Sequence, residues 1–255
     1  MPNKSNSLKF SSQRLISTVF LIIFVFDSIY IPMETVKKQL VSGALFIAVA
    51  KYSGVAINLL ITAILARILV PEQFAIVAIA SIVSNFFNLF CDFGFASAII
   101  QRQDLTEKDH SNIFSCSGYL GIVLSAIFFC SSGLFAGIYD QEILGNIVRI
   151  LSIQILFTSL NIVPNALLTK AKEFRFIAMR TIAINIVSGA SAVLFAFAYR
   201  SIYSLIITPI FTSVLLFTAN TLKVKTLRFT FNPNMASVKK NLSLIIQNAL
   251  DVDNA

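Results

Sequence analysis

Polar side chains recur along single faces of three long apolar segments. Their spacing of about one or two helical turns places the members of each set on a shared face. The sets are Lys51, Asn58 and Thr62; Ser81, Ser84, Asn85, Asn88 and Asp92; and Thr181, Asn185 and Ser188. Because polar groups surrounded by lipid need hydrogen-bond partners, these faces should meet one another or line a wet cavity. Two readings stay open, namely hydrogen bonding between helices and binding of a polar substrate.

Seven of these residues are our candidates for lining such a cavity: Lys51, Asn58, Thr62, Asn85, Asn88, Asp92 and Asn185. Lys51 is the only charged residue that we place well inside the long apolar segments after residue 40. A lysine at mid-membrane costs roughly 2.5–3.5 kcal/mol on insertion scales. Either Lys51 binds an anionic group of a substrate, or its long side chain extends toward the headgroups.

Three prolines and one glycine are candidates for turns and hinges. Pro71 cannot continue the helix before it, and Gly94 gives the backbone the freedom for a break. A plain interhelical turn accounts for both. Pro164 and Pro209 lie within apolar segments, where each removes a backbone hydrogen bond and can kink a membrane helix.

The residue types needed for catalysis or metal binding are sparse. The single histidine, His110, has no neighbouring ligand. The cysteines lack metal-ligand spacing and fit a packing role: Cys91, Cys116 and Cys130. A membrane enzyme would use acidic residues at a membrane face, and those available are scattered: Asp92, Asp104, Glu107 and Asp109. We therefore predict no catalytic residue, no metal and no cofactor, with a membrane-embedded enzyme as an alternative.

Long apolar helices must position these residues. Of the 255 residues, 56% are hydrophobic and 13% are charged, against about 45–50% and about 25% in soluble domains. A helix crosses the bilayer with about 20 apolar residues. Six segments approach or exceed this length: 41–65, 74–90, 113–138, 147–168, 176–199 and 202–222. The sequence predicts an all-α membrane protein, a bundle of six transmembrane helices joined as antiparallel hairpins.

Positive charge is concentrated on one side of the predicted bundle. The net charge is +8, and the residues on that side are Lys37, Lys38, Arg102, Lys108, Lys170, Lys172, Arg175, Arg180, Lys223, Lys225, Arg228, Lys239 and Lys240. The other side has Arg67, Arg149 and Arg200. Short basic loops stay in the cytoplasm. The charge therefore sets membrane orientation, and we expect no nucleic-acid partner.

A further apolar segment, residues 15–31, breaks this order. If it spanned the membrane, Lys4, Lys9 and Arg14 would lie outside, against the charge rule. It is either an extra N-terminal hydrophobic helix or part of an extension, residues 1–32, with a misassigned start. Met33 opens METVKKQLVSG, a short basic tail that leads into the first long helix.

Three stretches together resemble a known family. They are LARILVPEQFAIVAIA at residues 65–80, DFGFASAIIQRQDLTEKD at residues 92–109, and IVRILSIQILFTSLNIVPNALLTKAKEFRF at residues 147–176. Their order and spacing are similar to the polysaccharide biosynthesis proteins, which include the lipid-linked oligosaccharide flippases of the multidrug/oligosaccharidyl-lipid/polysaccharide exporter superfamily. The resemblance covers roughly residues 33–245.

The resemblance implies one lobe of a two-lobed transporter in the bacterial plasma (inner) membrane. Residues 33–235 would be the six-helix N-terminal lobe, and residues 236–255 the truncated start of a seventh helix. Such flippases move an isoprenoid-diphosphate-linked oligosaccharide outward by alternating access, for O-antigen, capsule or exopolysaccharide. Lys51 would then face the diphosphate. The expected partners are the lipid-linked oligosaccharide, membrane lipid, and a second lobe or second copy. The alternatives are an inactive truncated remnant and a glycan-biosynthesis enzyme in the membrane.

Overall fold

The computed structural model describes residues 36–92, 94–102, 105–225, 227 and 229. Within these ranges the chain forms eight α-helices and no strand. They are α2 (Val36–Leu65), α3 (Pro71–Cys91), α4 (Phe95–Gln101), α5 (Glu107–Cys130), α6 (Ser132–Tyr139), α7 (Glu142–Lys170), α8 (Phe174–Tyr199) and α9 (Tyr203–Val224). The segment 15–31 and residues 236–255 lie outside the described residues.

Six spans in the described part of the chain are long and apolar enough to cross a membrane. They correspond to the six predicted segments, so the prediction of an all-α membrane protein is confirmed. The third span, Glu107–Tyr139, consists of α5 and α6 with a break at Ser131. Two short helices, α4 and α6, were not predicted as separate elements.

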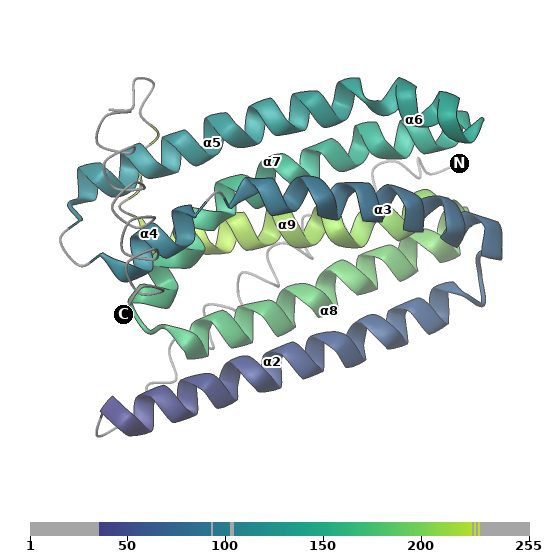
Figure 1. Ribbon diagram of the computed structural model, residues 1–255. Coiled ribbons are helices and arrows are strands. Elements are labelled where there is room, and N and C mark those ends of the chain that lie inside the picture. Colours follow the sequence, from purple (N-terminus) through teal and green to yellow (C-terminus); the bar gives the residue numbers. More distant parts are fainter. Residues whose placement is uncertain (1–35, 93, 103–104, 226, 228, 230–255) are drawn as a thin grey trace, which may run out of the picture.

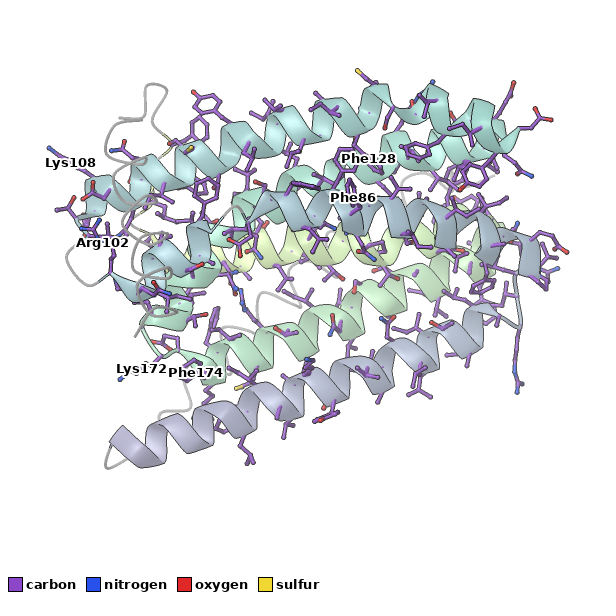
Figure 2. The ribbon with its side chains drawn as sticks, viewed as in Figure 1. Phe86, Arg102, Lys108, Phe128, Lys172 and Phe174 are labelled. Atoms are coloured by element: carbon purple, nitrogen blue, oxygen red, sulfur yellow. The ribbon has the colours of Figure 1, made fainter. Side chains whose placement is uncertain are left out.

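Helix α7 is the centre of the bundle (Figure 1), because it packs against α3, α4, α5, α6 and α9. The core on this side joins α3 to α5 and α7. Phe128 of α5, labelled in Figure 2, is fully buried, and its ring centroid lies 4.9 Å from that of Phe87. Ile147 and Ile155 of α7 are also fully buried. Burial of such side chains and close packing hold α7 in place.

Helix α2 lies at the edge of the bundle and packs chiefly against α8 (Figure 1). Glycines allow this approach. A Cβ atom at Gly54 would lie 2.9 Å from Asn185 Nδ2, and one at Gly189 would overlap the Ile61 side chain. The five-residue turn from Ala66 to Val70 makes α2 and α3 antiparallel without packing them together. The expectation that consecutive helices pair as hairpins is therefore wrong for α2 and α3, whose polar faces flank a cavity.

Most of the described lysines and arginines lie at one end of the bundle. Arg102, Lys108 and Lys172 all lie at one end of the bundle (Figure 2), which we call the basic end. There the Lys170 Nζ atom donates to the Arg102 carbonyl oxygen at 2.5 Å, tying α7 to the end of α4. Arg67 and Arg200 lie at the turns of the opposite end. The structure thus keeps the charge asymmetry that the sequence predicts.

Candidate functional site

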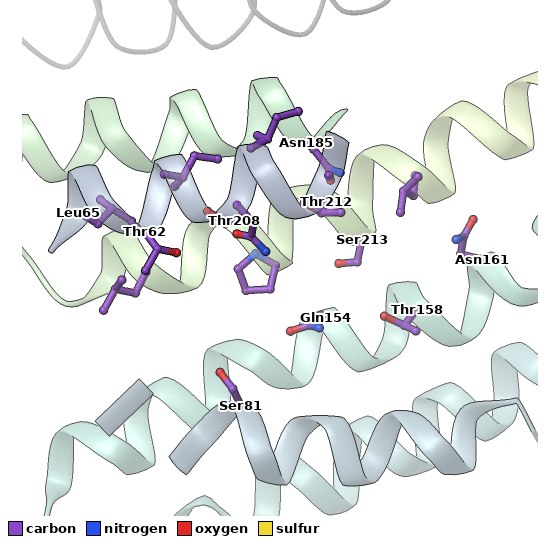
Figure 3. Close-up of a pocket in the computed structure, with 17 residues that line it drawn as sticks. Thr62, Leu65, Ser81, Gln154, Thr158, Asn161, Asn185, Thr208, Thr212 and Ser213 are labelled. Carbon is purple, nitrogen blue, oxygen red and sulfur yellow. The ribbon is translucent and has the colours of Figure 1, made fainter. Parts of the chain in front are cut away.

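A polar cavity of about 470 Å³ lies between α2, α3, α7, α8 and α9 (Figure 3). Ser81, which lines it, is the middle residue of the span Pro71–Cys91. Asn185 and Thr158 also lie near the middle of their spans. The cavity is therefore at mid-depth of the membrane, where polar groups are costly unless they serve packing or binding.

The cavity wall combines amides and hydroxyls with aliphatic side chains, and no charged residue is among the described residues that line it. Each of the five helices contributes at least one polar residue: Asn58, Thr62, Ser81, Gln154, Thr158, Asn161, Asn185, Thr208, Thr212 and Ser213. Figure 3 shows Thr62 and Thr208 on one wall and Ser81 and Gln154 on the opposite wall. Amides and hydroxyls both donate and accept hydrogen bonds, so the wall can bind a polar, uncharged group such as a sugar.

Hydrogen bonds between helices fix parts of this wall. The Thr212 hydroxyl of α9 donates to the Ser188 hydroxyl of α8 at 2.9 Å. The Asn220 Nδ2 atom of α9 donates to the Asn161 Oδ1 atom of α7 at 2.6 Å, and Asn220 is fully buried. These two bonds link α9 to α7 and α8, so part of the wall is fixed by contacts between helices.

Three of the seven cavity candidates line this cavity: Asn58, Thr62 and Asn185. The hinge candidate Pro209 lines it as well. The structure therefore brings together residues from α2, α8 and α9 that are far apart in the sequence.

Lys51 does not line the cavity, although it lies on the same face of α2 as Asn58. It precedes Asn58 by seven residues, which is roughly 10 Å along the helix axis toward the basic end. Its side chain is exposed. The position is compatible both with an anion-binding cation at the cavity mouth and with a lysine that extends toward the headgroups.

The remaining candidates on α3 have other surroundings. Asn85 is exposed, and the Oδ1 atom of Asn88 is buried without a hydrogen-bond partner in the described structure. Asp92 Oδ1 accepts a hydrogen bond from the Ala96 backbone N–H at 3.0 Å, so Asp92 caps the start of α4. None of the three lines the cavity.

Two of the other turn candidates, Pro71 and Gly94, lie at helix boundaries. Pro71 is the first residue of α3, where a missing N–H costs nothing. Gly94 has φ 83°, in the left-handed region that favours glycine, and it separates α3 from α4. Pro164 is buried inside α7, outside the cavity wall.

Sequence reasoning missed the polar face of α7. Gln154, Thr158, Asn161 and Asn165 follow one another at steps of four, three and four residues, which is the same signal that identified the other faces. It also counted Arg180 only among the charges of the basic side and did not predict that it is buried. Arg180 lies inside α8 and is only 3% exposed, so Lys51 is not the only charged residue well inside the helices.

Comparison with known proteins agrees with this architecture. The chain is 27% identical over 178 residues to the teichuronic acid biosynthesis protein TuaB of Bacillus subtilis, covering 70% of the chain and 37% of TuaB. It is 26% identical over 145 residues to the lipopolysaccharide biosynthesis protein WzxC of Escherichia coli, covering 57% of the chain and 30% of WzxC. Less than half of each relative's length is therefore matched.

No solved structure matches the chain. The family described as polysaccharide biosynthesis protein matches residues 64–250, well over half of the sequence. This match contains all three stretches on which the resemblance rested, together with α3 to α9 and most of the cavity wall. The chain is a multi-pass membrane protein that belongs to the polysaccharide biosynthesis protein family.

Proposed function

We propose that this chain forms one lobe of a transporter that flips a lipid-linked oligosaccharide across the bacterial plasma membrane. The observation that carries the proposal is the mid-membrane cavity, whose described lining has ten amide or hydroxyl side chains among aliphatic ones and no charged residue. Two of the ten hydrogen-bonding side chains around this volume, Asn161 and Thr212, bond to a neighbouring helix, and ten are more than those two bonds require. A glycan crossing the membrane needs such a surface, because its hydroxyls lose water on leaving the aqueous phase.

The chemistry of the wall suits the sugar part of the cargo. Amide side chains such as Asn58, Gln154 and Asn185 can each donate and accept, which matches the hydroxyl groups of a sugar. The isoprenoid tail would stay in lipid beside the exposed apolar side chains of α2, among them Leu59 and Leu60. Lys51, on the same face of α2, would meet the diphosphate.

Membrane orientation is part of the proposal. The basic end carries most of the lysines and arginines of the short connections, and such loops are retained in the cytoplasm. The lipid-linked sugar would therefore enter from the basic end and leave at the end that holds Arg67 and Arg200.

A second lobe, or a second copy of this chain, would complete the cavity. Helix α2 packs chiefly against α8 and leaves large apolar side chains exposed on its other faces. Alternating access needs two bodies that rock about a shared site. The relatives matched by this chain are also more than twice as long as the matched region.

Export in a bacterial strain that lacks its own flippase tests the proposal. The chain would be expressed alone and together with a second lobe, and surface polysaccharide would be measured. We expect Asn58→Leu and Asn185→Leu to lower export at unchanged membrane levels. Asn146→Leu makes the same chemical change at an exposed position near the start of α7 and should leave export unchanged.

Failure of the wild-type chain to restore export in either setting would contradict the proposal and favour the inactive remnant. Equal export by the Asn58→Leu, Asn185→Leu and Asn146→Leu variants would remove the cavity from the mechanism. Glycan synthesis by the purified chain would favour the enzyme alternative.

A further inference from the structure

Arg180 of α8 is a buried cation with unused hydrogen-bond donors. Its side chain is 3% exposed, and its Nη2 atom donates to the Asn165 Oδ1 atom of α7 at 2.6 Å. Its Nε and Nη1 atoms are buried and have no hydrogen-bond partner in the described structure. The centre of the guanidinium lies 5.8 Å from the centroid of the Phe176 ring.

This arrangement leaves most of the guanidinium unsatisfied. Arginine keeps its positive charge in proteins and has five N–H donors. A neutral amide and an aromatic face compensate only part of the cost of burying that charge. Buried charges normally have an opposite charge or several hydrogen bonds. Two donor atoms of the guanidinium, Nε and Nη1, therefore remain available to an anion.

Arg180 lies just beyond the basic end of the polar cavity. Asn165 follows the cavity residue Asn161 by four residues, which is about one helical turn along α7. Gln154, Thr158, Asn161 and Asn165 thus form a polar row that leads from the cavity wall to the guanidinium. An anionic group bound at Arg180 could therefore remain attached to a sugar that occupies the cavity.

A second cation lies beside the same aromatic ring. The Lys223 Nζ atom of α9 is 5.1 Å from the centroid of Phe176. Two positive groups from different helices therefore converge on one ring near the start of α8.

We propose that Arg180 is the binding residue for a lipid phosphate at the basic end of the cavity. The proposal rests on the proposed function and deepens it, because the lipid-linked sugar has a diphosphate between its two parts. Nη2 is already bonded to Asn165, and the phosphate oxygens accept hydrogen bonds from Nε and Nη1. A membrane phospholipid presents the same phosphate chemistry, so the test separates the two sources.

Fluorescence offers a direct test, since the chain contains no tryptophan. Phe176→Trp places a single reporter next to Arg180. The full chain with this change would be reconstituted in phosphatidylcholine nanodiscs and titrated with geranylgeranyl diphosphate. Geranylgeraniol, which has the same tail without phosphate, is the matched ligand control.

We expect a saturable fluorescence change with the diphosphate and none with the alcohol. Adding Arg180→Gln should weaken binding about ten- to hundredfold, the range for losing a charge-assisted hydrogen bond. Lys172→Gln removes an exposed positive charge from the same end and should leave the affinity unchanged. Arg180→Lys keeps the charge with fewer donors and should give an intermediate affinity. It also keeps the test decisive if Arg180→Gln does not fold.

Three outcomes would overturn the proposal: equal responses to the diphosphate and the alcohol, equal affinities with and without Arg180→Gln, or equal affinities of the Arg180→Lys and unsubstituted forms. Nanodiscs that contain phosphatidylglycerol separate the sources. If phosphatidylglycerol competes with geranylgeranyl diphosphate, the phosphate site is supported and its ligand is membrane lipid. If the diphosphate still binds in the presence of phosphatidylglycerol, the ligand is the diphosphate of the lipid-linked sugar. Binding requires no transport, so a chain that binds but does not export contradicts only the proposed function.

Discussion

The hydrogen bond between Asn161 and Asn220 shows how single residues stabilise the cavity wall. Asn220→Leu removes the donor to the Asn161 Oδ1 atom, which lies at 2.6 Å. We expect a loss of about 0.6–1.7 kcal/mol in stability, as for hydrogen bonds between membrane helices. The measurement is reversible unfolding in mixed micelles.

A double-mutant cycle isolates the pair. The double variant Asn161→Leu, Asn220→Leu should lose less stability than the sum of the two single variants. Each single variant leaves one asparagine without its hydrogen-bond partner, whereas the double variant removes both asparagines. Thr218→Val serves as the control on α9, since its exposed hydroxyl donates to the Val214 carbonyl of its own helix. Strictly additive losses would show that the two amides act independently.

Lys51 carries a prediction about charge at the cavity mouth. Lys51→Met should preserve expression and abolish glycan export in whichever assembly is competent, while Lys51→Arg should retain part of it. The reason is that the diphosphate requires a positive charge more than a particular side-chain shape. Export of surface polysaccharide is the readout, with the exposed Lys172→Met as control. Normal export by Lys51→Met would leave Lys51 as a lysine that only reaches the headgroups.

For single residues, the sequence predicted that amides and hydroxyls line the site, but it predicted less well which of these residues do so. Asn58, Thr62 and Asn185 line the cavity because periodicity reports which face of a helix is polar. Periodicity does not report which neighbour that face meets. Asp92 therefore looked like a cavity residue although it caps α4. Arg180 was missed because it lies six residues after the start of α8, where a loop charge and a buried charge look alike in the sequence.

At the scale of helices, the contact between α2 and α8 depends on small residues. Gly189→Val would place its side chain against Ile61, so we expect a loss of about 1–3 kcal/mol in stability from overpacking. Gly133→Val is the matched control, because nothing lies within 4 Å of a Cβ atom there. The melting temperatures of the two variants in detergent provide the measurement.

Shortening the opposing side chain should reverse the effect. Ile61→Ala added to Gly189→Val makes room for the new side chain and should recover part of the lost stability. Equal melting temperatures for Gly189→Val and Gly133→Val would mean that α2 and α8 adjust freely and that the glycine does not define their distance.

The six long helices were predictable because bilayer thickness demands about 20 apolar residues whatever the packing. The short helices α4 and α6 were not, because seven or eight residues show too few turns for a clear period. The partner of α2 was also wrongly expected, since a short turn suggests a hairpin. Close glycine contacts with α8 outweigh that proximity in the sequence.

For the whole molecule, the orientation in the membrane is testable. Reporter enzymes that work only outside the cytoplasm should be active when fused after Arg67, Asp140 or Arg200. These residues lie at the turns opposite the basic end. Fusions after Lys172 should be inactive, because basic loops are retained inside. Activity at Lys172 together with silence at the other three sites would reverse the orientation and the direction of transport.

The position of α2 at the edge of the bundle also has a consequence for biosynthesis. Its main packing partner, α8, begins more than 100 residues after α2 ends. At about 5–20 residues per second, a ribosome needs roughly 5–20 s to make that stretch. During this interval α2 lies in the bilayer without its contact to α8. The first of the described helices is thus among the last to be packed, and substitutions at Gly54 or Gly189 should lengthen the time during which membrane proteases can capture the nascent chain.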